Sequence, residues 1–372
     1  MLLKGLKILD FSTLLPGPFA TMMLADLGAE VVHVTKPVEE GRQWGPDEYL
    51  QRSKKSLAVD LKSPEVVASI KELLKEQEYD IVVEQFRPGV MARLGLDYES
   101  LKAINPGLIY CSITGYGQTG SYSERGGHDI NYVALAGLQG YSGTKENGPA
   151  NIGFQVADLA GGSMHAVIGI LSAVIYRGTT GLGQHLDISM TDCALTLNAL
   201  FAHDYLAEGK PLAREELILN GGSFYGYYET LDGRYLSVGS LEPKFRQQLC
   251  GAIGSPDLLR LALSNKPDDM AMLKEQLQST FKQKTLEEWH SIFSEVDACV
   301  EPVLTFEETV EHPLFKDREM FVEIAKPDGT TQKQIACPIK SNLFQASYGT
   351  VGVKAGAHNE EILGHLLKKK IK

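Results

Sequence analysis

The first 115 residues alternate between short apolar runs and longer segments with helical spacing. The apolar runs lie at 7–11, 30–34, 56–61, 80–84 and 108–114, and the helical segments include 19–29 and 64–76. Strands that are apolar on both faces and alternate with helices are typical of a parallel sheet that is covered on both sides. The pattern therefore predicts an α/β fold with a Rossmann-like architecture in this part of the chain.

The middle of the chain combines a flexible loop with a long apolar helix. Gly115, Gly117 and Gly120 follow the last of these strands, and open α/β sheets bind their ligands at such positions. The helix expected over 160–176 is apolar nearly all round, so we expect it to be buried in the core or at a subunit contact. Residues 185–190 then alternate like a further strand.

The hydrophobic pattern changes character at about residue 224. The sequence FYGYYETLDGRYLSVG places aromatic residues on both sides of Asp232 and Gly233, which is a strong signal for a β-hairpin. Helical patterns continue to about residue 315, and PDGT at Asp328 predicts another hairpin. We expect a smaller α+β domain over 224–315.

Length and charge narrow the class of protein. A chain of 372 residues is long for one compact core, so two domains are expected. The formal net charge is -11, whereas nucleic-acid binding depends on concentrated Lys and Arg. The composition therefore argues against nucleic acid as the main partner.

The number and spacing of the cysteines and the hydropathy of the chain are used to predict its cellular compartment. The five cysteines are odd in number and show no CxxC spacing, so neither a disulfide framework nor a thiolate zinc site is indicated. The sequence has no run of 18 apolar residues, and MLLKGLKILDF leads directly into strand-like sequence. These features predict a reduced, cytoplasmic protein without a membrane partner.

Two titratable residues lie beside glycines where the backbone bends easily. His128 stands in GGHDINY, and Asp158 stands in VADLAGG at the start of the apolar helix. Either residue alone is more often structural, and Asp158 would suit a helix N-cap. A helix N-terminus also offers N–H donors that could hold an enolate oxygen near Asp158. Arg87 and Glu242 are further candidates, each with a surface charge as the plainer interpretation.

Several ordered motifs together resemble the class III CoA-transferase superfamily of the CaiB/BaiF type, and within it the α-methylacyl-CoA racemase branch. They are GLKILDFSTLLPGPFATMMLADLGAEVVHV, KKSLAVDLK, FRPGVMARLGLDYESLKAINPGLIYCSITGYGQTG, GGHDINYVALAG, VADLAGGSMHAVIGIL, TGLGQHLDISM and DGRYLSVGSLEPKF. The similarity extends over nearly the whole chain.

The resemblance implies a particular domain organisation. A large Rossmann-like, CoA-binding domain would comprise 1–200 and 325–372, and a small α+β domain would comprise 224–315. Linkers at 201–223 and 316–324 would join them. Two copies of the chain would interlock as a homodimer.

The resemblance also implies functional residues. His128 and Asp158 would be acid/base groups, and Glu242 would support His128. CoA would be bound by Lys36, Ala58, Val59, Asp60, Leu61, Lys62, Arg87, Asp129, Ile130, Asn131 and Tyr132. Related racemases often have arginine at the position of Lys36, and a lysine lacks the planar guanidinium that stacks on adenine.

The activity implied is interconversion of (2R)- and (2S)-2-methylacyl-CoA thioesters by α-proton transfer through an enolate. It needs two bases on opposite faces of the α-carbon and no metal or redox cofactor, and coenzyme A enters as part of the substrate. The alternative is CoA transfer to a free carboxylate with Asp158 as the nucleophile. A silent CoA-binding protein is a third hypothesis, but the coexistence of His128, Asp158 and Glu242 speaks against it.

Overall fold

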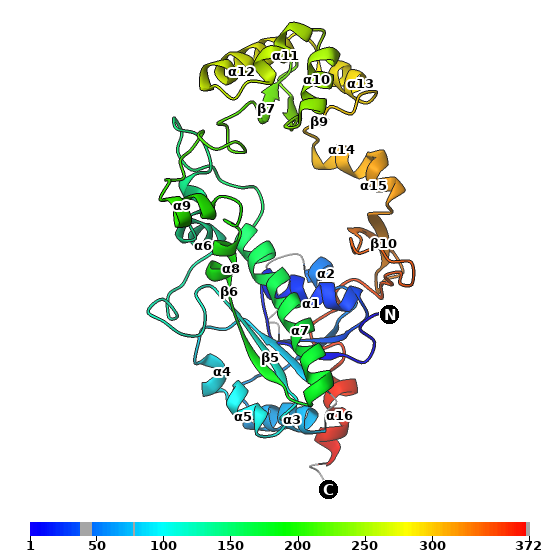
Figure 1. Ribbon diagram of the computed structural model, residues 1–372. Helices are drawn as coiled ribbons and strands as arrows, with labels where there is room; N and C mark the ends of the chain where they lie inside the picture. Colours follow the sequence, from blue (N-terminus) through cyan, green and yellow to red (C-terminus); the bar gives the residue numbers. More distant parts are fainter. Residues whose placement is uncertain (38–46, 77–78, 370–372) are drawn as a thin grey trace. The chain divides into compact units, whose positions relative to one another are not determined.

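The computed structural model describes residues 1–37, 47–76 and 79–369 of the chain (Figure 1). These residues form two compact units. One contains Met1–Ala136, Ile152–Leu197 and Pro313–Lys372, and the other contains Gly137–Asn151 and Asn198–His312.

The first unit is built on a six-stranded sheet in which all neighbours pair in parallel. Its strands are β1 (Lys7–Asp10), β2 (Glu30–Thr35), β3 (Lys55–Ala58), β4 (Ile81–Glu84), β5 (Ile109–Thr114) and β6 (Gln184–Ser189). The order β3-β2-β1-β4-β5-β6 is that of the Rossmann fold, and it reverses direction between β1 and β4. The predicted parallel α/β sheet is therefore confirmed.

One predicted strand is shorter than expected. Strand-like sequence continued to Leu61, but β3 ends at Ala58. The carboxylate of Asp60 accepts the N–H of Lys62 at 2.9 Å, and the carbonyl of Asp60 accepts the N–H of Ser63 at 3.0 Å. These local bonds turn the chain, since an Asp side chain competes with the sheet for backbone donors.

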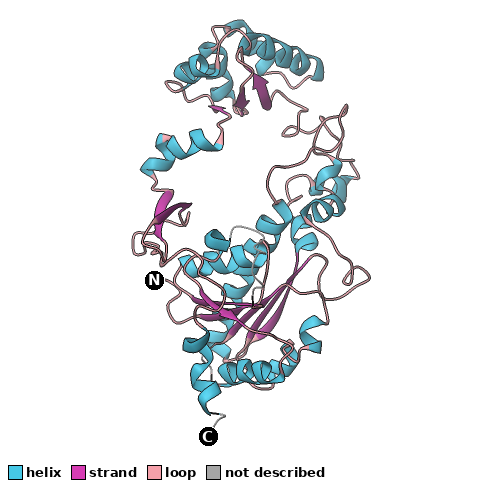
Figure 2. Ribbon diagram, turned by 180° about the vertical axis from the view of Figure 1, so that it is seen from behind, coloured by secondary structure: helices cyan, strands magenta, loops and turns pink. Residues whose placement is uncertain are grey.

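Helices cover both faces of the sheet (Figure 2). On one face, α1 (Pro16–Asp26) and α7 (Met164–Thr180) pack side by side. On the other, a cluster of buried side chains joins the strands to α3 (Pro64–Lys75), α4 (Val90–Arg93), α5 (Tyr98–Lys102) and α16 (Asn359–Lys369). The C-terminal helix thus completes a core that is formed mainly by the first 110 residues.

The sequence of α3 explains where this helix begins and which of its faces is buried. The Ser63 hydroxyl caps the helix by accepting the N–H of Val66, and Pro64 occupies the first turn, where its missing N–H costs nothing. Ile70 and Leu73 are completely buried against the sheet, while the charged residues face outward. This amphipathic pattern is the signal that predicted the helix.

Helix α7 is less buried than expected. Ala166, Val167, Ile170 and Ala173 are buried against the sheet and α1, but an outer stripe is exposed: Met164, Ile168, Ile175 and Tyr176. By length and composition alone, the helical run Val156–Thr180 could also cross a membrane, which is weak evidence because core helices share these properties. The core of this unit therefore buries one face of the helix, and burial of the exposed stripe at a subunit contact stays a prediction.

The remaining elements of the first unit are short. They are α2 (Asp47–Leu50), α6 (Asp129–Leu135), the π-helix η2 (Val156–Ser163), α8 (Met190–Thr196), α15 (Pro313–Asp317), β10 (Phe321–Ala325) and β11 (Thr331–Ile335). The last two strands form an antiparallel hairpin around Asp328, as the PDGT sequence predicted.

The second unit has a three-stranded antiparallel sheet and several helices. The strands are β7 (Gly226–Glu229), β8 (Tyr235–Val238) and β9 (Val300–Pro302), and the first two form the predicted hairpin around Asp232 and Gly233. Trp289 is almost fully buried at the centre of its core and donates its indole N–H to the carbonyl of Phe281 at 2.8 Å.

The second unit also contains several helices. They are η1 (Leu138–Gly140), α9 (Ala202–Glu208), α10 (Pro243–Ala252), η3 (Pro256–Leu258), α11 (Leu259–Ala262), α12 (Pro267–Phe281), α13 (Leu286–Phe293) and α14 (Phe306–Glu311). Of these, α10, α11, α12 and α13 contribute side chains to the core around Trp289. The α+β composition expected for this part of the sequence is present.

Candidate functional site

The carboxyl ends of the six strands lie along one edge of the sheet, because parallel strands run in the same direction. Lys36 follows β2, residues 58–62 end and follow β3, and Arg87 follows β4. The CoA-binding residues predicted in the first half of the chain therefore lie at the edge where open α/β sheets bind ligands.

The backbone around His128 is held by two of the residues that follow it. His128 precedes α6, and its N–H donates to the Asn131 side-chain oxygen at 3.0 Å. The Tyr132 hydroxyl donates to the carbonyl of Gly127 at 2.5 Å, and its ring packs edge-on against Tyr116. The His128 side chain itself is exposed. A solvent-accessible imidazole on a fixed backbone is suited to contact a substrate.

Asp158 lies inside a π-helix, which the sequence did not predict. The residue was expected to cap the long helix, but Gln155 holds the N-cap position and Asp158 lies in the first turn of η2. Gly162 allows the π-helix to pack closely against Met190, because a Cβ on Gly162 would lie 2.9 Å from the Met190 Cγ atom. Short π-helical turns occur frequently at functional sites.

His128, Asp129 and Asp158 come together although 29 residues separate the last two. The Asp158 N–H donates to the Asp129 Oδ1 atom at 3.0 Å. Burial, followed by the negative charge of Asp129, raises the pKa of Asp158 to about 6, and the charge of His128 opposes this rise. A carboxyl group with such a pKa can both accept and return a proton near neutral pH.

The start of η2 provides fewer free donors than expected. Asp129 accepts the N–H of Asp158, and the Gln155 carbonyl accepts the N–H of Leu159 at 3.2 Å. The expectation that the helix N-terminus at Asp158 holds an enolate oxygen is therefore wrong for these two N–H groups, since both already have partners.

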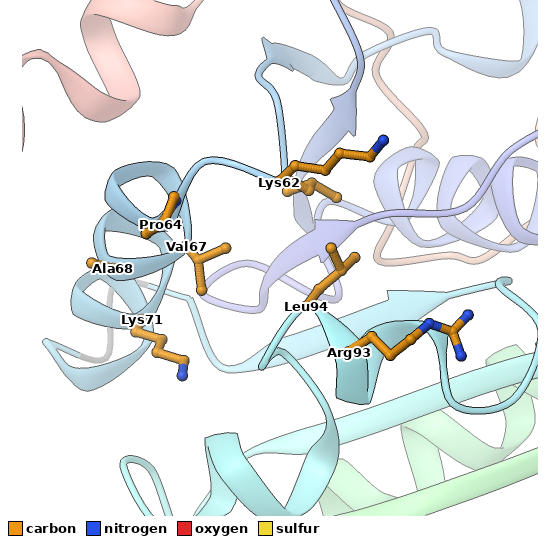
Figure 3. A pocket seen from close by; sticks show the side chains of 8 residues that line it. Lys62, Pro64, Val67, Ala68, Lys71, Arg93 and Leu94 are labelled. Atoms are coloured by element: carbon orange, nitrogen blue, oxygen red, sulfur yellow. The ribbon is translucent and has the colours of Figure 1, made fainter.

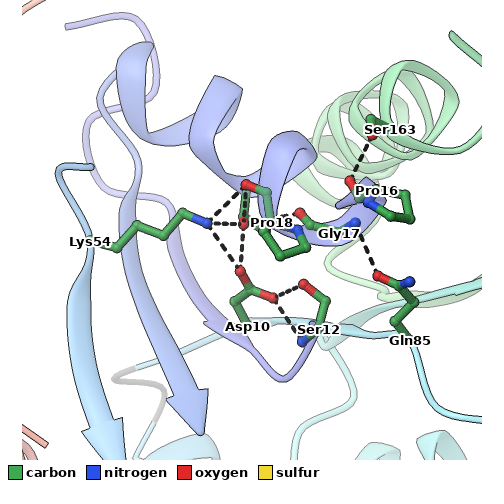
Figure 4. Close-up of polar contacts among 9 residues, drawn as sticks. Asp10, Ser12, Pro16, Gly17, Pro18, Lys54, Gln85 and Ser163 are labelled. Atoms are coloured by element: carbon green, nitrogen blue, oxygen red, sulfur yellow. Dashed lines mark hydrogen bonds and ion pairs between the residues drawn. The ribbon is translucent and has the colours of Figure 1, made fainter. Parts of the chain in front are cut away.

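A hydrogen-bond network fixes η2 to the start of α1 (Figure 4). The Ser163 hydroxyl lies 2.7 Å from the carbonyl of Pro16 and 3.0 Å from that of Asp158. Gln85, which follows β4, accepts the N–H of Gly17 at 3.1 Å. The turn that carries Asp158 is thus connected to the point where the strand order of the sheet reverses.

A fully buried ion pair holds the start of α1 against the sheet. The Lys54 ammonium lies 3.3 Å from the Asp10 carboxylate and donates to the carbonyl of Pro18 at 2.9 Å (Figure 4). Burial lowers the pKa of Lys54 to about 8, although Asp10 acts in the opposite direction. Burial would raise the pKa of Asp10, but Lys54, His33 and two hydroxyl groups hold it below its usual value. Every charge in this cluster has a partner, as buried charges require.

Replacing Ser163 with alanine is expected to lower the free energy of unfolding by about 0.5–1.5 kcal/mol, because one buried hydrogen bond to the carbonyl of Pro16 is lost. Denaturant unfolding measures the change. Ser172→Ala is the matched control, since this exposed hydroxyl of α7 also bonds a backbone carbonyl. Equal stability of both variants would show that the contact between Ser163 and Pro16 contributes nothing.

A pocket of about 470 Å³ lies between α3, the end of α4 and the turn after β3 (Figure 3). Its walls are apolar and include Val67 and Leu94, while Lys62, Lys71 and Arg93 carry its positive charge. Within the described ranges, none of these three cations forms an ion pair. An apolar pocket with unpaired cations suits a flat ring that bears phosphate groups.

The sequence prediction included Leu61 and Lys62 but missed Lys71 and Arg93. Lys71 is one of several charged residues of α3 and Arg93 ends the short helix α4, so nothing in the sequence distinguishes either from a surface cation. Only the packing of α3 beside α4 brings them to one pocket.

The other predicted CoA-binding residues have varied surroundings. Ala58 exchanges two backbone hydrogen bonds with the side-chain amide of Asn359, at 2.9 and 2.8 Å. Val59 is buried, whereas Lys36, Asp60 and Ile130 are exposed. The structure thus separates this set into backbone positions that are already bonded and side chains that remain accessible.

Arg87 lines a different, smaller cavity of about 150 Å³. Its neighbours there include Glu84, whose buried carboxyl has its pKa raised to about 7 by burial, and Ser112, whose hydroxyl lies 3.0 Å from the His185 Nε2 atom. Sequence reasoning missed Glu84, although an acidic residue that ends a wholly apolar strand is itself a signal.

Glu242 belongs to the second unit. It is exposed, stands immediately before α10 and makes no side-chain cap to that helix. Its support of His128 stays a prediction. Throughout residues 1–37, 47–76 and 79–369, no group of three His, Cys, Asp or Glu side chains could hold a metal ion.

Comparisons with known proteins agree on one protein family. Residues 3–359 match the model of CoA-transferase family III. The chain is 38% identical to human alpha-methylacyl-CoA racemase, over 98% of this chain and 93% of that protein. It is 31% identical to succinate–glutarate CoA-transferase of Agrobacterium fabrum, over 98% and 95% of the two chains.

A solved structure is also similar. The crystal structure of a CAIB/BAIF family protein from Brucella suis has a TM-score of 0.83 and 30% sequence identity, and the match covers 98% of each chain.

Proposed function

Because the chain belongs to CoA-transferase family III, we propose that it is a racemase that interconverts (2R)- and (2S)-2-methylacyl-CoA thioesters. The observation that carries the proposal is the electrostatic coupling of His128 to an Asp158 whose pKa is about 6. Inversion needs one group that removes the α-proton and another that returns a proton to the opposite face. An imidazole beside a carboxyl group with a raised pKa can exchange these roles.

In the proposed reaction the thioester makes the α-proton acidic, and the enzyme lowers the barrier to its removal. The ionised carboxylate of Asp158 takes the proton from one enantiomer, and protonated His128 delivers a proton to the other face of the enolate. In the reverse direction neutral His128 is the base and protonated Asp158 is the acid. Positioned acid/base groups typically contribute about 100- to 10,000-fold to the rate.

We propose that the pocket beside Lys62, Lys71 and Arg93 binds the adenosine end of CoA. Its apolar walls suit an adenine ring, and the three cations suit phosphate groups. As the family resemblance implies, the proposal includes an interlocked homodimer in which Glu242 supports His128.

The experiment that tests this function follows one enantiomer of a 2-methylacyl-CoA without any acceptor acid. Loss of enantiomeric excess with no change in total thioester is expected. Full retention of configuration at high enzyme concentration would refute the racemase proposal.

The second candidate function is CoA transfer between an acyl-CoA and a free carboxylate, with Asp158 as the covalent nucleophile. Similarity to a succinate–glutarate CoA-transferase favours it. It predicts thioester exchange that requires an acceptor acid and an acyl-Asp158 adduct that hydroxylamine traps.

The pH profile of racemisation is expected to fall below about pH 6 and also at high pH. Asp158 ionises near pH 6, so below that value its carboxyl group holds a proton and cannot act as the base. At high pH Asp158 is fully ionised, so it has no proton to return in the reverse direction. Initial rates from pH 4.5 to 9 measure the profile, with circular dichroism at each pH to verify folding. A plateau at high pH would favour the transferase, which needs only ionised Asp158.

Lys71→Ala is expected to raise the KM for acyl-CoA by about threefold to tenfold while kcat stays within about twofold, because one phosphate contact corresponds to roughly 1 kcal/mol. Arg93→Ala should act in the same direction. The matched control is Lys75→Ala, one helical turn further along α3, where the lysine contacts Glu72 and does not line the pocket. Equal KM values for the Lys71 and Lys75 variants would exclude this pocket from CoA binding.

A further inference from the structure

Asp129 connects the two candidate bases through one side chain. It directly follows His128 in the chain, and its Oδ1 atom accepts the N–H of Asp158 at 3.0 Å. This hydrogen bond joins the start of α6 to η2 across 29 residues of sequence. The relative position of the two bases therefore depends on a residue that family resemblance assigned only to CoA binding.

The segment that carries Asp129 is itself firmly held. Asn131 accepts the N–H of His128, and the Tyr132 hydroxyl donates to the carbonyl of Gly127. The Tyr132 ring also packs against Gly115 at the end of β5, where an added Cβ would lie 2.6 Å from it. Asp129 can thus transmit the position of this segment to Asp158.

Asp129 also acts on the charge of Asp158. Among the described residues, the titratable groups that interact electrostatically with Asp158 are Asp129, His128 and Tyr132, all at the start of α6. Burial is the largest cause of the raised pKa of Asp158, the Asp129 carboxylate is the second, and His128 opposes both. Without the charge of Asp129, Asp158 would hold its proton less readily.

We propose that Asp129 is a positioning residue for the reaction: its carboxylate fixes the backbone of Asp158 relative to His128. This inference rests on the proposed racemase function. It assigns Asp129 to the proton-transfer step, which would affect kcat. A role in binding CoA would instead affect the KM for acyl-CoA.

Two substitutions separate the contributions of the hydrogen bond and the charge. Asp129→Asn keeps an oxygen that can accept the Asp158 N–H but removes the charge, so the acid limb of the pH profile should move to lower pH with a modest loss of kcat. Asp129→Ala removes both, and kcat should fall by about 100-fold, as misplacement of a catalytic group can cost. The KM for acyl-CoA should stay within about threefold in both variants.

The matched control is Asp268→Asn, which changes an exposed aspartate in the first turn of α12. It should alter neither the pH profile nor kcat. Melting temperatures of all variants show whether they fold. A higher KM with unchanged kcat and an unchanged acid limb in both Asp129 variants would overturn the proposal and assign Asp129 to CoA contact.

A measurement without turnover tests the coupling even if the racemase assignment fails. Protein labelled with ¹³C at the aspartate carboxyl carbon is titrated by NMR, and Asp158→Asn identifies the Asp158 signal. The midpoint for Asp158 should move to lower pH in Asp129→Asn and stay unchanged in Asp268→Asn. Wild-type protein that lacks racemisation but shows this shift would refute the proposed function alone, whereas an unshifted midpoint would refute the role of Asp129.

Discussion

Replacing His128 with alanine is expected to reduce racemisation by about 1,000-fold, because the enolate can no longer receive a proton from the imidazole side. The variant keeps Asp158 on the opposite face. It should therefore still exchange the α-proton of one enantiomer with heavy water, with retention of configuration, while the other enantiomer stays unexchanged. Chiral chromatography and mass spectrometry measure inversion and exchange separately.

The affinity for acyl-CoA should be nearly unchanged in His128→Ala, since the imidazole is exposed and the backbone of the segment is held by Asn131 and Tyr132. His290→Ala, at a histidine of α13 in the second unit, is the control for loss of an exposed imidazole. Wild-type racemisation by His128→Ala would remove His128 from the reaction. Loss of exchange for both enantiomers would show instead that the two bases do not act on separate faces.

Asp158→Asn is expected to produce the reciprocal result. Racemisation should again fall by about 1,000-fold, but the enantiomer that retains exchange should be the one that His128→Ala cannot exchange. The same substitution removes the only carboxylate proposed as a covalent nucleophile, so any hydroxylamine-trapped adduct should also disappear. The two variants together therefore test directly whether His128 and Asp158 act on opposite faces of the α-carbon.

The stability of Asp158→Asn offers an internal control. Burial and Asp129 raise the pKa of Asp158 to about 6, above its unfolded value, so the ionised form opposes folding at pH 7. Removing that charge should raise the melting temperature at pH 7, and the difference should diminish as the pH falls below 6. A variant that is inactive and also less stable would indicate local unfolding of η2, and the kinetic loss would then not identify a base.

Much of the fold could be predicted from the sequence because it depends on local periodicity. Wholly apolar strands between amphipathic helices predict a parallel sheet, and the turns at Asp232 and Asp328 predict the two hairpins. The exposed stripe of α7 could not be predicted, because hydropathy shows that a helix is apolar but not which neighbours are present to cover it.

The candidate site was predicted in its residue types but not in its geometry. His128 and Asp158 stand out in the sequence because glycines flank them. The π-helical turn at Asp158, the hydrogen bond from Asp129 and the attachment of Ser163 to Pro16 all depend on contacts between distant segments. Such contacts have no local signature, so the sequence did not show that Gln155 is the N-cap or that the N–H groups of Asp158 and Leu159 already have partners.

The burial of individual charged side chains could not be predicted from the sequence either. Nothing in the sequence distinguishes Lys54 from Lys55, yet Lys54 is completely buried against Asp10 while Lys55 is partly exposed. Alternation along a strand predicts that neighbours face opposite ways, but only the structure shows that α1 covers the side of Lys54. A charge that is buried and fully paired is structural support, not a ligand contact.

Incorporation of deuterium from heavy water tests the central claim most directly. A 2-methylacyl-CoA is incubated with the enzyme in heavy water without acceptor acid, and parallel samples contain hydroxylamine. The account predicts deuterium at the α-carbon of both enantiomers and no adduct on Asp158. Absence of deuterium together with a trapped acyl-Asp158 would contradict it and identify the chain as a CoA transferase.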